Sequence, residues 1–412
     1  MKKTTKAVIF SIVLAAAVHA EPPAQDHPSA HRYSLEQATS DKAQLHTIAF
    51  DGLAWLTGNF ASDTFLPPGK VSDYFGFQYM RDIDADGMGH NTSFLTRIAH
   101  NMLTILNEEQ KRSLMDLAAR QENDIRLFAE KRFPLILAFR RLLEGDIPAG
   151  STGLNKAAVT RYSADLYELD GRLSYDRARV MGGILSHLDA SQKAALAKLK
   201  FGQSSTWPEV PEPIDRQSLP HEQHVAVMTY ASEMFAWVAG SLEADVYFCP
   251  ERHGMYFGGF GMKMAPAMGK KNYSISTSLT GDSGEAFLAA LTPTQRKQIT
   301  DLPDLQRQDL AGIVKIRRAI ATELRRFQKG ETASQENVLA LSRKYGELDG
   351  EMAYFYATAF AAVGKSLSAE QRQQLTQLRG HNDPPSPGAF LYSQRIERPD
   401  AGNTDFLFTP AK

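Results

Sequence analysis

Six side chains that bind soft metal ions lie close together in the second half of the chain. They are one thiol, one imidazole and four thioethers: Cys249, His253, Met255, Met262, Met264 and Met268. Thiolate, thioether and imidazole groups suit Cu(I), so this segment is a candidate copper site. The alternative is that the methionines fill irregular gaps against neighbouring helices. A related segment earlier in the chain has Pro67 and Val71 in place of Cys249 and His253, which counts against copper.

Two further patterns have the spacing of metal ligands. Residues 82–87 read Asp-Ile-Asp-Ala-Asp-Gly, which is similar to the start of a calcium loop. The acid expected at the twelfth position is replaced by Ser93, so an Asp-rich turn is the competing interpretation. His221 and His224 are spaced to share a metal ion on one helical turn, or they are ordinary surface histidines.

Aromatic side chains cluster in two related segments that are rich in glycine. The first contains Tyr74, Phe75 and Phe77, and the second contains Tyr256, Phe257 and Phe260. One interpretation is a loop packed over a helical core, in which glycine permits close backbone approach. The other is an exposed aromatic surface that binds clients or a partner.

Acidic pairs are the only residues with a pattern that suggests acid–base chemistry. Glu168 and Asp170 recur as Glu347 and Asp349. Their position in the middle of predicted helices that also carry arginines favours ion pairs instead. We find no phosphate-binding loop, nucleophile motif or zinc-protease motif, and the sequence therefore predicts a protein that is not an enzyme.

Four segments carry the pattern of a helix capping box. A short polar residue stands at the N-cap and glutamine stands three residues later, in the pairs Asn107 and Gln110, Asp189 and Gln192, Thr292 and Gln295, and Ser368 and Gln371. The N-cap oxygen accepts a hydrogen bond from the first turn, and the glutamine side chain reaches back to the N-cap N–H. Each segment has leucine before it and lysine or arginine after it, so we predict four similar helix starts, each contributing about 1 kcal/mol.

This Leu-Thr-x-x-Gln pattern resembles the Spy/CpxP group of periplasmic helical proteins. Only residues 291–295 match the motif literally, and the other three segments replace its threonine. The resemblance covers residues 106–200 and 291–379 and does not include the aromatic segments. It implies a stress-related periplasmic protein: members act as ATP-independent chaperones, as inhibitors of envelope sensor kinases, or as zinc-, nickel- or copper-responsive proteins. Small members pair into a cupped dimer, and we expect this chain to build a similar cup from two halves.

Recurring motifs at a spacing near 180 residues predict an internal duplication. Ala-Trp at residues 54–55 recurs at 236–237, and Arg-Arg at 140–141 recurs at 325–326. We therefore predict a signal peptide at 1–20, a polar leader at 21–39, a first unit at 40–202, a Pro-rich linker at 203–223, a second unit at 224–380 and an extended tail at 381–412. The aromatic clusters of that tail either dock on the body or fray.

Helical periodicity dominates both units. Ile313, Ile316, Ile320, Leu324 and Phe327 form one apolar stripe with the 3.6-residue period. In the first unit, residues 114–143 have the same character, and Pro134 should break that helix. Residues 158–188 and 334–364 read as return helices. The predicted fold class is all-α: two tandem helical-hairpin units joined to long Gly/Pro/aromatic loops, at 58–92 and 240–284.

The first 20 residues have the features of a secretory signal. Basic residues precede an apolar stretch that is too short to cross a bilayer, and Val-His-Ala at 18–20 is a small-residue cleavage site. A periplasmic location is therefore expected. The net charge of −1 gives no field that would attract nucleic acid or acidic membranes.

The combined interpretation is a non-catalytic periplasmic Spy/CpxP-like stress protein or chaperone that binds non-native or partner envelope proteins. It would bind no nucleic acid and would not span the membrane. The first alternative is a copper-type resistance or sensing protein that uses the segment from Cys249 to Met268. The second is a structural subunit of an envelope complex, with the aromatic tail as its docking segment.

Overall fold

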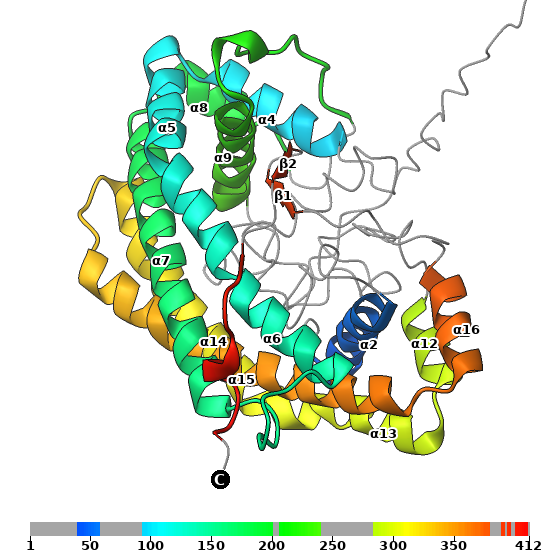
Figure 1. Ribbon diagram of the computed structural model, residues 1–412. Helices are drawn as coiled ribbons and strands as arrows, with labels where there is room; N and C mark the ends of the chain where they lie inside the picture. Colours follow the sequence, from blue (N-terminus) through cyan, green and yellow to red (C-terminus); the bar gives the residue numbers. More distant parts are fainter. Residues whose placement is uncertain are drawn as a thin grey trace, which may run out of the picture.

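The computed structural model describes residues 39–57, 93–200, 206–239, 283–379, 389–391, 394–396 and 400–410. The chain is almost entirely helical in these ranges, which confirms the predicted all-α class (Figure 1). The strands of this part form one antiparallel ribbon, β1 (Ala389–Leu391) and β2 (Gln394–Ile396). None of the described helices is both long enough and apolar enough to cross a membrane.

The helices follow one another in a similar order in the two halves. The first half contains α2 (Asp41–Thr57), α4 (Ser93–Ile105), α5 (Glu108–Lys131), α6 (Phe133–Glu144), α7 (Lys156–Ser186) and α8 (Ala190–Leu196). The second half contains α9 (His221–Ala239), α12 (Ser283–Ala290), α13 (Pro293–Thr300), α14 (Leu302–Leu324), α15 (Gln335–Ser366) and α16 (Ala369–Arg379). Short 3-10 helices are η3 (Arg216–Ser218), η8 (Arg325–Lys329) and η9 (Asp405–Leu407).

Proline sets the helix breaks in both halves. The expected break at Pro134 is present, since α5 ends at Lys131 and α6 begins at Phe133 with the proline in its first turn. In the second half the break comes earlier, at Asp301, and Pro303 lies in the first turn of α14. Pro lacks the N–H that a helix interior requires but is tolerated in a first turn, so each proline starts a new helix.

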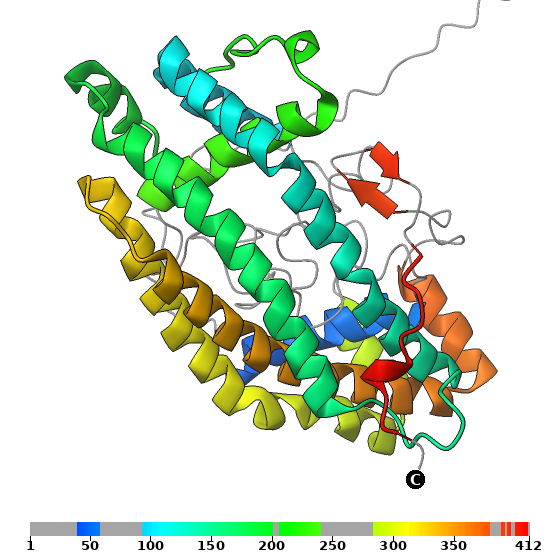
Figure 2. The same ribbon diagram turned by 60° about the vertical axis from the view of Figure 1, so that its left-hand side comes forward.

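The return helices α7 and α15 lie side by side over most of their length (Figures 1 and 2). Small residues make this close approach possible. A Cβ added at Gly171 would lie 2.4 Å from Oγ of Ser342, and one added at Gly350 would lie 2.7 Å from Cβ of Ser163. Gly350 lies 179 residues after Gly171, and Ser342 lies 179 residues after Ser163. The same two positions therefore meet in both contacts, with the two helices exchanged.

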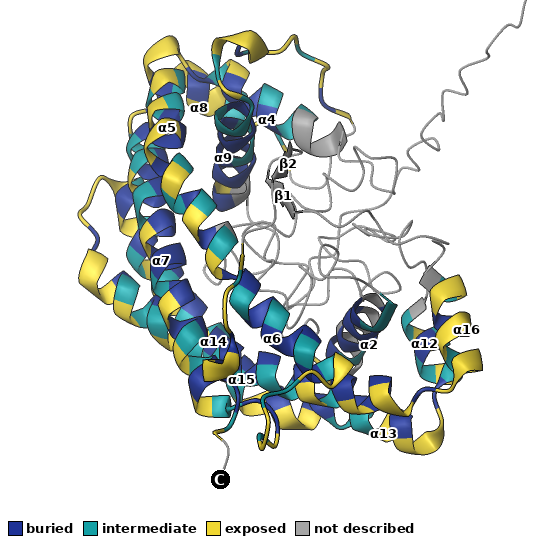
Figure 3. Cartoon of the chain, in the orientation of Figure 1, coloured by how far each residue is buried: buried dark blue, intermediate teal, exposed yellow. Residues whose placement is uncertain are grey.

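Two hydrophobic cores flank this pair of helices. The first contains residues of α4, α5, α9, α14, η8, the C-terminal part of α7 and the N-terminal part of α15. The second contains residues of α2, α6, α12, α13, α16 and the C-terminal part of α15. Each core therefore draws on both predicted units, because α2 packs in the second core and α9 packs in the first. Figure 3 shows the buried residues on the inner faces of these helices.

The predicted Pro-rich linker lies against the first core over its described part. Trp207 and Ile214 are buried there, and the Trp207 ring meets Phe235 of α9 edge-on at 4.9 Å. Asn101 of α4 also donates a hydrogen bond to the carbonyl of Pro208 at 3.0 Å. These contacts fix the path of residues 207–214 along the first core.

Candidate functional site

The four predicted capping boxes are all formed. At the start of α5, Oδ1 of Asn107 accepts from the N–H of Gln110 at 2.9 Å, and Oε1 of Gln110 accepts from the N–H of Asn107 at 3.0 Å. The same reciprocal pair of hydrogen bonds joins Asp189 to Gln192, Thr292 to Gln295 and Ser368 to Gln371. These bonds satisfy backbone donors that a helix start otherwise leaves unpaired.

The two capping glutamines of the first half also bind each other. Nε2 of Gln192 donates to Oε1 of Gln110 at 2.7 Å and to the carbonyl of Ile105 at 2.9 Å. Both glutamines are buried. We call this arrangement, in which two capping glutamines are joined side chain to side chain, a glutamine clasp. It ties the start of α8 to the start of α5 and to the end of α4.

A second glutamine clasp joins α13 to α16. Nε2 of Gln371 donates to Oε1 of Gln295 at 2.9 Å and to the carbonyl of Ala290 at 2.8 Å. Nε2 of Gln295 donates to the carbonyl of Ser366 at 3.0 Å. The carbonyls of Ile105 and Ala290 are thus bound in the same way, at the ends of α4 and α12, and the two clasps have matching parts.

The clasp explains why the motif requires glutamine. The side-chain oxygen accepts from the N-cap N–H while the amide group donates to the other glutamine and to a helix-terminal carbonyl. Glutamate would lack the donors, and alanine would lack both functions. Sequence reasoning predicted each box but not their pairing. The signal was the similar separation of the two motifs, 82 residues in the first half and 76 in the second.

Removing one clasp glutamine should destabilise the fold measurably. We expect Gln371→Ala to lower the free energy of unfolding by about 1–3 kcal/mol, since the side chain of Gln295 and the carbonyl of Ala290 lose a partly buried hydrogen bond. Urea unfolding followed by circular dichroism measures this loss. Gln373→Ala on the exposed side of the same helix is the matched control and should stay within about 0.5 kcal/mol of wild type. Equal effects of the two changes would contradict a structural role for the clasp.

Buried ionisable residues occur at matched positions of α2 and α9. Glu233 of α9 forms a fully buried ion pair with Arg177 of α7. Asp51 of α2 lies 182 positions before Glu233 and is also buried. The residue near Asp51 that corresponds to Arg177, 179 positions after it, is Tyr356 of α15. Neither carboxylate oxygen of Asp51 has a hydrogen-bond partner in the described part of the chain, and burial raises its pKa well above the usual range.

Stability should therefore depend on pH through Asp51. Its carboxyl is protonated in the folded protein at pH values where it is ionised in the unfolded chain, so unfolding releases a proton. The stability that protonation provides is fully present below the unfolded pKa of about 3.9 and is lost as pH rises toward the folded pKa. We expect Asp51→Asn to gain stability over wild type by up to about 1.4 kcal/mol per pH unit in that window. Urea unfolding of both proteins at several pH values measures this, and a constant difference would contradict it.

Most predicted ligand and client-binding residues lie outside the described residues. These are the candidate copper ligands Cys249, His253, Met255, Met262, Met264 and Met268, the aromatic residues Tyr74, Phe75, Phe77, Tyr256, Phe257 and Phe260, and the Asp-rich segment 82–87. Across the described ranges, no three His, Cys, Asp or Glu residues gather in a way that could hold a metal ion.

The histidine pair His221 and His224 lies in the first turn of α9, and His224 has an acidic partner. Nε2 of His224 lies 2.9 Å from Oε1 of Glu212 in the linker. Burial lowers the pKa of His224, although Glu212 and its hydrogen bond oppose the shift. The neighbouring Glu222 forms an ion pair with Arg126 of α5 at 2.9 Å. The arrangement ties the linker and α9 to the first core.

The repeated acidic residues contribute to ion pairs and to the helix interface. Glu168 accepts a hydrogen bond from Arg343 of α15 at 3.2 Å, and Glu347 accepts one from Lys344 at 2.6 Å. Asp170 and Asp349 are buried. The ion-pair interpretation of the two glutamates agrees with these contacts.

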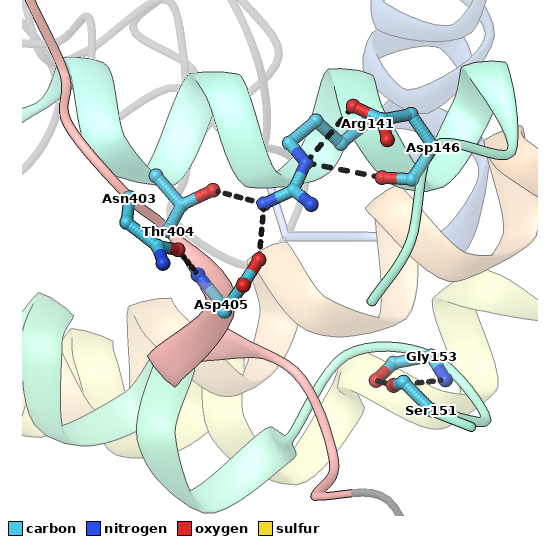
Figure 4. Close-up of polar contacts among 7 residues, drawn as sticks. All are labelled: Arg141, Asp146, Ser151, Gly153, Asn403, Thr404 and Asp405. Carbon is cyan, nitrogen blue, oxygen red and sulfur yellow. Dashed lines mark hydrogen bonds and ion pairs between the residues drawn. The ribbon is translucent and has the colours of Figure 1, made fainter. Parts of the chain in front are cut away.

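The end of the tail packs against the body of the protein, which agrees with the expectation that its apolar cluster docks rather than frays. Leu407 and Phe408 are buried beside the α6–α7 loop, and the carbonyl of Leu407 accepts from the N–H of Asn155 at 2.8 Å. Arg141 of α6 holds the tail from the other side: its guanidinium donates to Asp405 at 2.8 Å and to Thr404 at 2.9 Å (Figure 4). Phe406 remains exposed.

Comparison with known proteins finds a family match in the second half. No curated protein and no solved structure matches the chain. The match to one protein-family model covers residues 287–379, from within α12 to the end of α16, and so includes both helices of the second glutamine clasp. That family is described as LTXXQ motif family protein.

Proposed function

We propose that this is a periplasmic, Spy/CpxP-like stress protein that binds non-native or partner envelope proteins without catalysis. The observation that carries the proposal is the LTXXQ family match over residues 287–379, together with a motif geometry that the first half repeats. The N-terminal signal pattern supports a periplasmic location.

A tandem origin of the two halves is part of this proposal. Two matched features support it besides the two clasps. Arg140 lies over the Trp55 ring and donates to the Trp55 carbonyl at 3.1 Å, and Arg325 has the same two contacts with Trp237. The α7–α15 contact is reciprocal, as a contact between two copies of one unit would be. We infer that the chain combines in one polypeptide what small members of this group form as a dimer.

The client-binding surface is proposed to lie in the aromatic segments rather than on the described helices. The described surface exposes large apolar side chains only singly: Leu127, Val238, Leu305 and Phe406. Single exposed residues are ordinary on a protein surface, whereas client capture needs a contiguous apolar area. The repeated aromatic residues at 74–77 and 256–260 are the sequence's best candidates for that area.

Aggregation of a chemically denatured client in the absence of ATP tests the proposal. The mature chain should suppress light scattering by the client. Serine replacements should abolish this protection when placed at the proposed client-binding residues Tyr74, Phe75, Phe77, Tyr256, Phe257 and Phe260. The matched control replaces Leu127 and Leu305 on α5 and α14 by serine and should protect fully. A chain that leaves client aggregation unchanged would contradict the proposal.

Copper binding is the alternative that a specific sequence feature favours. The soft-ligand set from Cys249 to Met268 should bind Cu(I) if it is a site, and Cys249→Ala with His253→Ala should remove the metal. Elemental analysis of the purified chain measures this directly. One-to-one copper without client protection would favour a resistance or sensing protein. The other alternative is a structural subunit that docks through its tail. Of the apolar residues 406–408 in the described end of that tail, Phe406 is exposed, while Leu407 and Phe408 are buried within this chain.

A further inference from the structure

The end of the tail is bound to the α6–α7 loop through main-chain hydrogen bonds. Leu154 of the loop and Phe408 of the tail form an antiparallel β-bridge. On one side of the bridge the N–H of Asn155 donates to a tail carbonyl at 2.8 Å, and on the other side the N–H of Thr409 donates to the carbonyl of Gly153 at 2.8 Å. Bonds between main-chain groups would hold any extended segment at this place, as in peptide recognition by strand addition.

Three side chains of the docked segment, residues 404–409, add selectivity to this pairing. Leu407 and Phe408 are buried in the second core, where the segment contacts α6 and α7. The guanidinium of Arg141 lies 5.1 Å from the centre of the Phe408 ring. It also donates to the carboxylate of Asp405 at 2.8 Å (Figure 4). The recognised pattern is therefore an acid, one exposed residue, and then an aliphatic–aromatic pair.

The loop that receives the docked segment differs from its counterpart in the second half. It runs over residues 145–155, whereas the loop between η8 and α15 runs over 330–334 and is six residues shorter. Gly153, whose φ of 136° favours glycine, lies in the longer loop and binds the tail through its carbonyl. The second half joins the matching helices with the shorter loop, so the extra residues are not needed to connect α6 to α7.

The arginine beside the shorter loop binds two acids of its own half. Arg326, the counterpart of Arg141, forms ion pairs with Glu323 at 3.2 Å and with Glu331 at 3.3 Å. Glu323 lies one turn earlier on the preceding helix, and Glu331 lies in the loop. This cation therefore has two acidic partners without any contribution from the tail.

The arginine beside the longer loop has only one of these two acids. Asp146 takes the place of Glu331 and binds Arg141 at 3.1 Å, but Ala138 stands at the position of the other acid. The tail supplies a second acid in the form of Asp405. This corner of the first half is thus complementary to an acidic residue that comes from outside it.

We propose that the α6–α7 corner is a peptide-binding site and that the end of the tail is its built-in occupant. The partner it fits is an extended segment of another protein, with an acidic residue two positions before an aliphatic–aromatic pair. Such a segment displaces the tail and repeats its contacts: the acid binds Arg141, the pair packs on α6 and α7, and the main chain pairs with residues 153–155. The site uses none of the aromatic segments, so it goes beyond the client binding proposed above and does not depend on it.

Fluorescence anisotropy of a labelled peptide with the sequence of residues 400–412 tests the site. The receptor is the full mature chain carrying Leu407→Ser and Phe408→Ser, which weaken the docking of its own tail and leave the corner unchanged. Saturable one-to-one binding is expected. Wild type should bind about tenfold more weakly, because its tethered tail competes at a high effective concentration. No saturable binding to the variant, or equal binding to both chains, would overturn the proposal.

Matched changes in the receptor and in the peptide locate the binding. Arg141→Gln in the receptor should weaken binding about fivefold, as the loss of a partly exposed ion pair does, and so should Asp405→Lys in the peptide. Arg326→Gln, at the matching position of the second half, should leave the affinity unchanged. Equal affinities of the two receptor variants would overturn the site.

A second peptide tests whether the site reads the pattern or only the tail's own sequence. It keeps the acid, the aliphatic residue and the aromatic residue at their spacing and replaces the other positions by serine and glycine. Saturable binding of this peptide is expected. Its failure to bind would overturn the proposed class of partner, as would a concentration-dependent dimer of wild type that Leu407→Ser and Phe408→Ser abolish, since the occupant would then be the tail of a second copy.

A variant with a charge change covers the case in which the two serine replacements prevent folding. Asp405→Lys in the full chain alters a partly exposed side chain and places it against Arg141, so it weakens the docking of the tail without emptying the core. Circular dichroism should show the same helix content as wild type. This variant should bind the labelled peptide more tightly than wild type does, and equal affinity would overturn the proposal.

Discussion

Replacing Arg177 by methionine should lower the free energy of unfolding by about 3–5 kcal/mol, which is the largest single effect we expect. The substitution leaves the carboxylate of Glu233 buried without its cation, and an uncompensated buried charge is costly. Tyr230 packs beside the pair and binds Gln121 of α5 at 2.9 Å, so the disturbance would reach three helices of the first core. Urea unfolding of the full chain measures the loss.

A double variant distinguishes the destabilisation caused by an unpaired buried charge from the net contribution of the ion pair to the free energy of unfolding. Arg177→Met combined with Glu233→Met should recover most of the stability, because apolar replacements of a buried ion pair are often neutral or better. The matched control is Arg343→Met, which breaks the partly exposed ion pair of Arg343 with Asp165 and Glu168 between α15 and α7. It should cost no more than about 1 kcal/mol. A double variant as unstable as the single one would contradict the argument.

Adding one methyl group at Gly346 should cost about 2–3 kcal/mol. The new Cβ would lie 2.6 Å from the carbonyl oxygen of Ser163 and 2.8 Å from the Cα of Ala164, both backbone atoms of α7. Backbone atoms within a packed helix cannot move aside as a flexible side chain can, so the two helices must separate. Thermal or urea unfolding of Gly346→Ala reports the cost.

Gly183→Ala is the control for this substitution. Gly183 also lies inside α7, but an added Cβ there would meet no atom within 4 Å. Alanine is a better helix former than glycine, so this variant should gain about 0.5–1 kcal/mol. The two variants should thus change stability in opposite directions. A stabilising Gly346→Ala would show that α7 and α15 do not pack as closely as described here.

Local structure was largely predictable from the sequence. The four capping boxes, the break at Pro134 and the two return helices all follow from patterns within about ten residues, and the structure has each of them. The apolar stripe of α14 was also informative, since Ile313 and Leu324 are buried. These features depend on backbone donors, proline geometry and helical period, which a single segment carries by itself.

Long-range pairing was not predictable in the same way. Nothing in α2 indicates that it packs with α12 and α16 rather than with α4 and α5, because its apolar face would suit either core. The glutamine clasps are also long-range contacts. Predicting them requires knowing which second capping glutamine lies beside the first, and the residues around each glutamine do not give that information. The predicted copper ligands and aromatic client surface stay predictions, since they lie outside the described residues.

Crosslinking of α2 most directly tests how the two halves are combined. In the fold, Arg307 of α14 forms an exposed ion pair with Asp41 of α2, and Nη2 of Arg307 donates to Oδ2 of Asp41 at 3.2 Å, although 266 residues separate them. With Cys249 replaced by serine, cysteines at 41 and 307 should be joined within one chain by a short bismaleimide. Cysteines at 41 and 122, where Glu122 is the counterpart of Arg307 in the first half, should stay unlinked. Efficient linkage of 41 to 122 instead would place α2 in its own half and contradict the account.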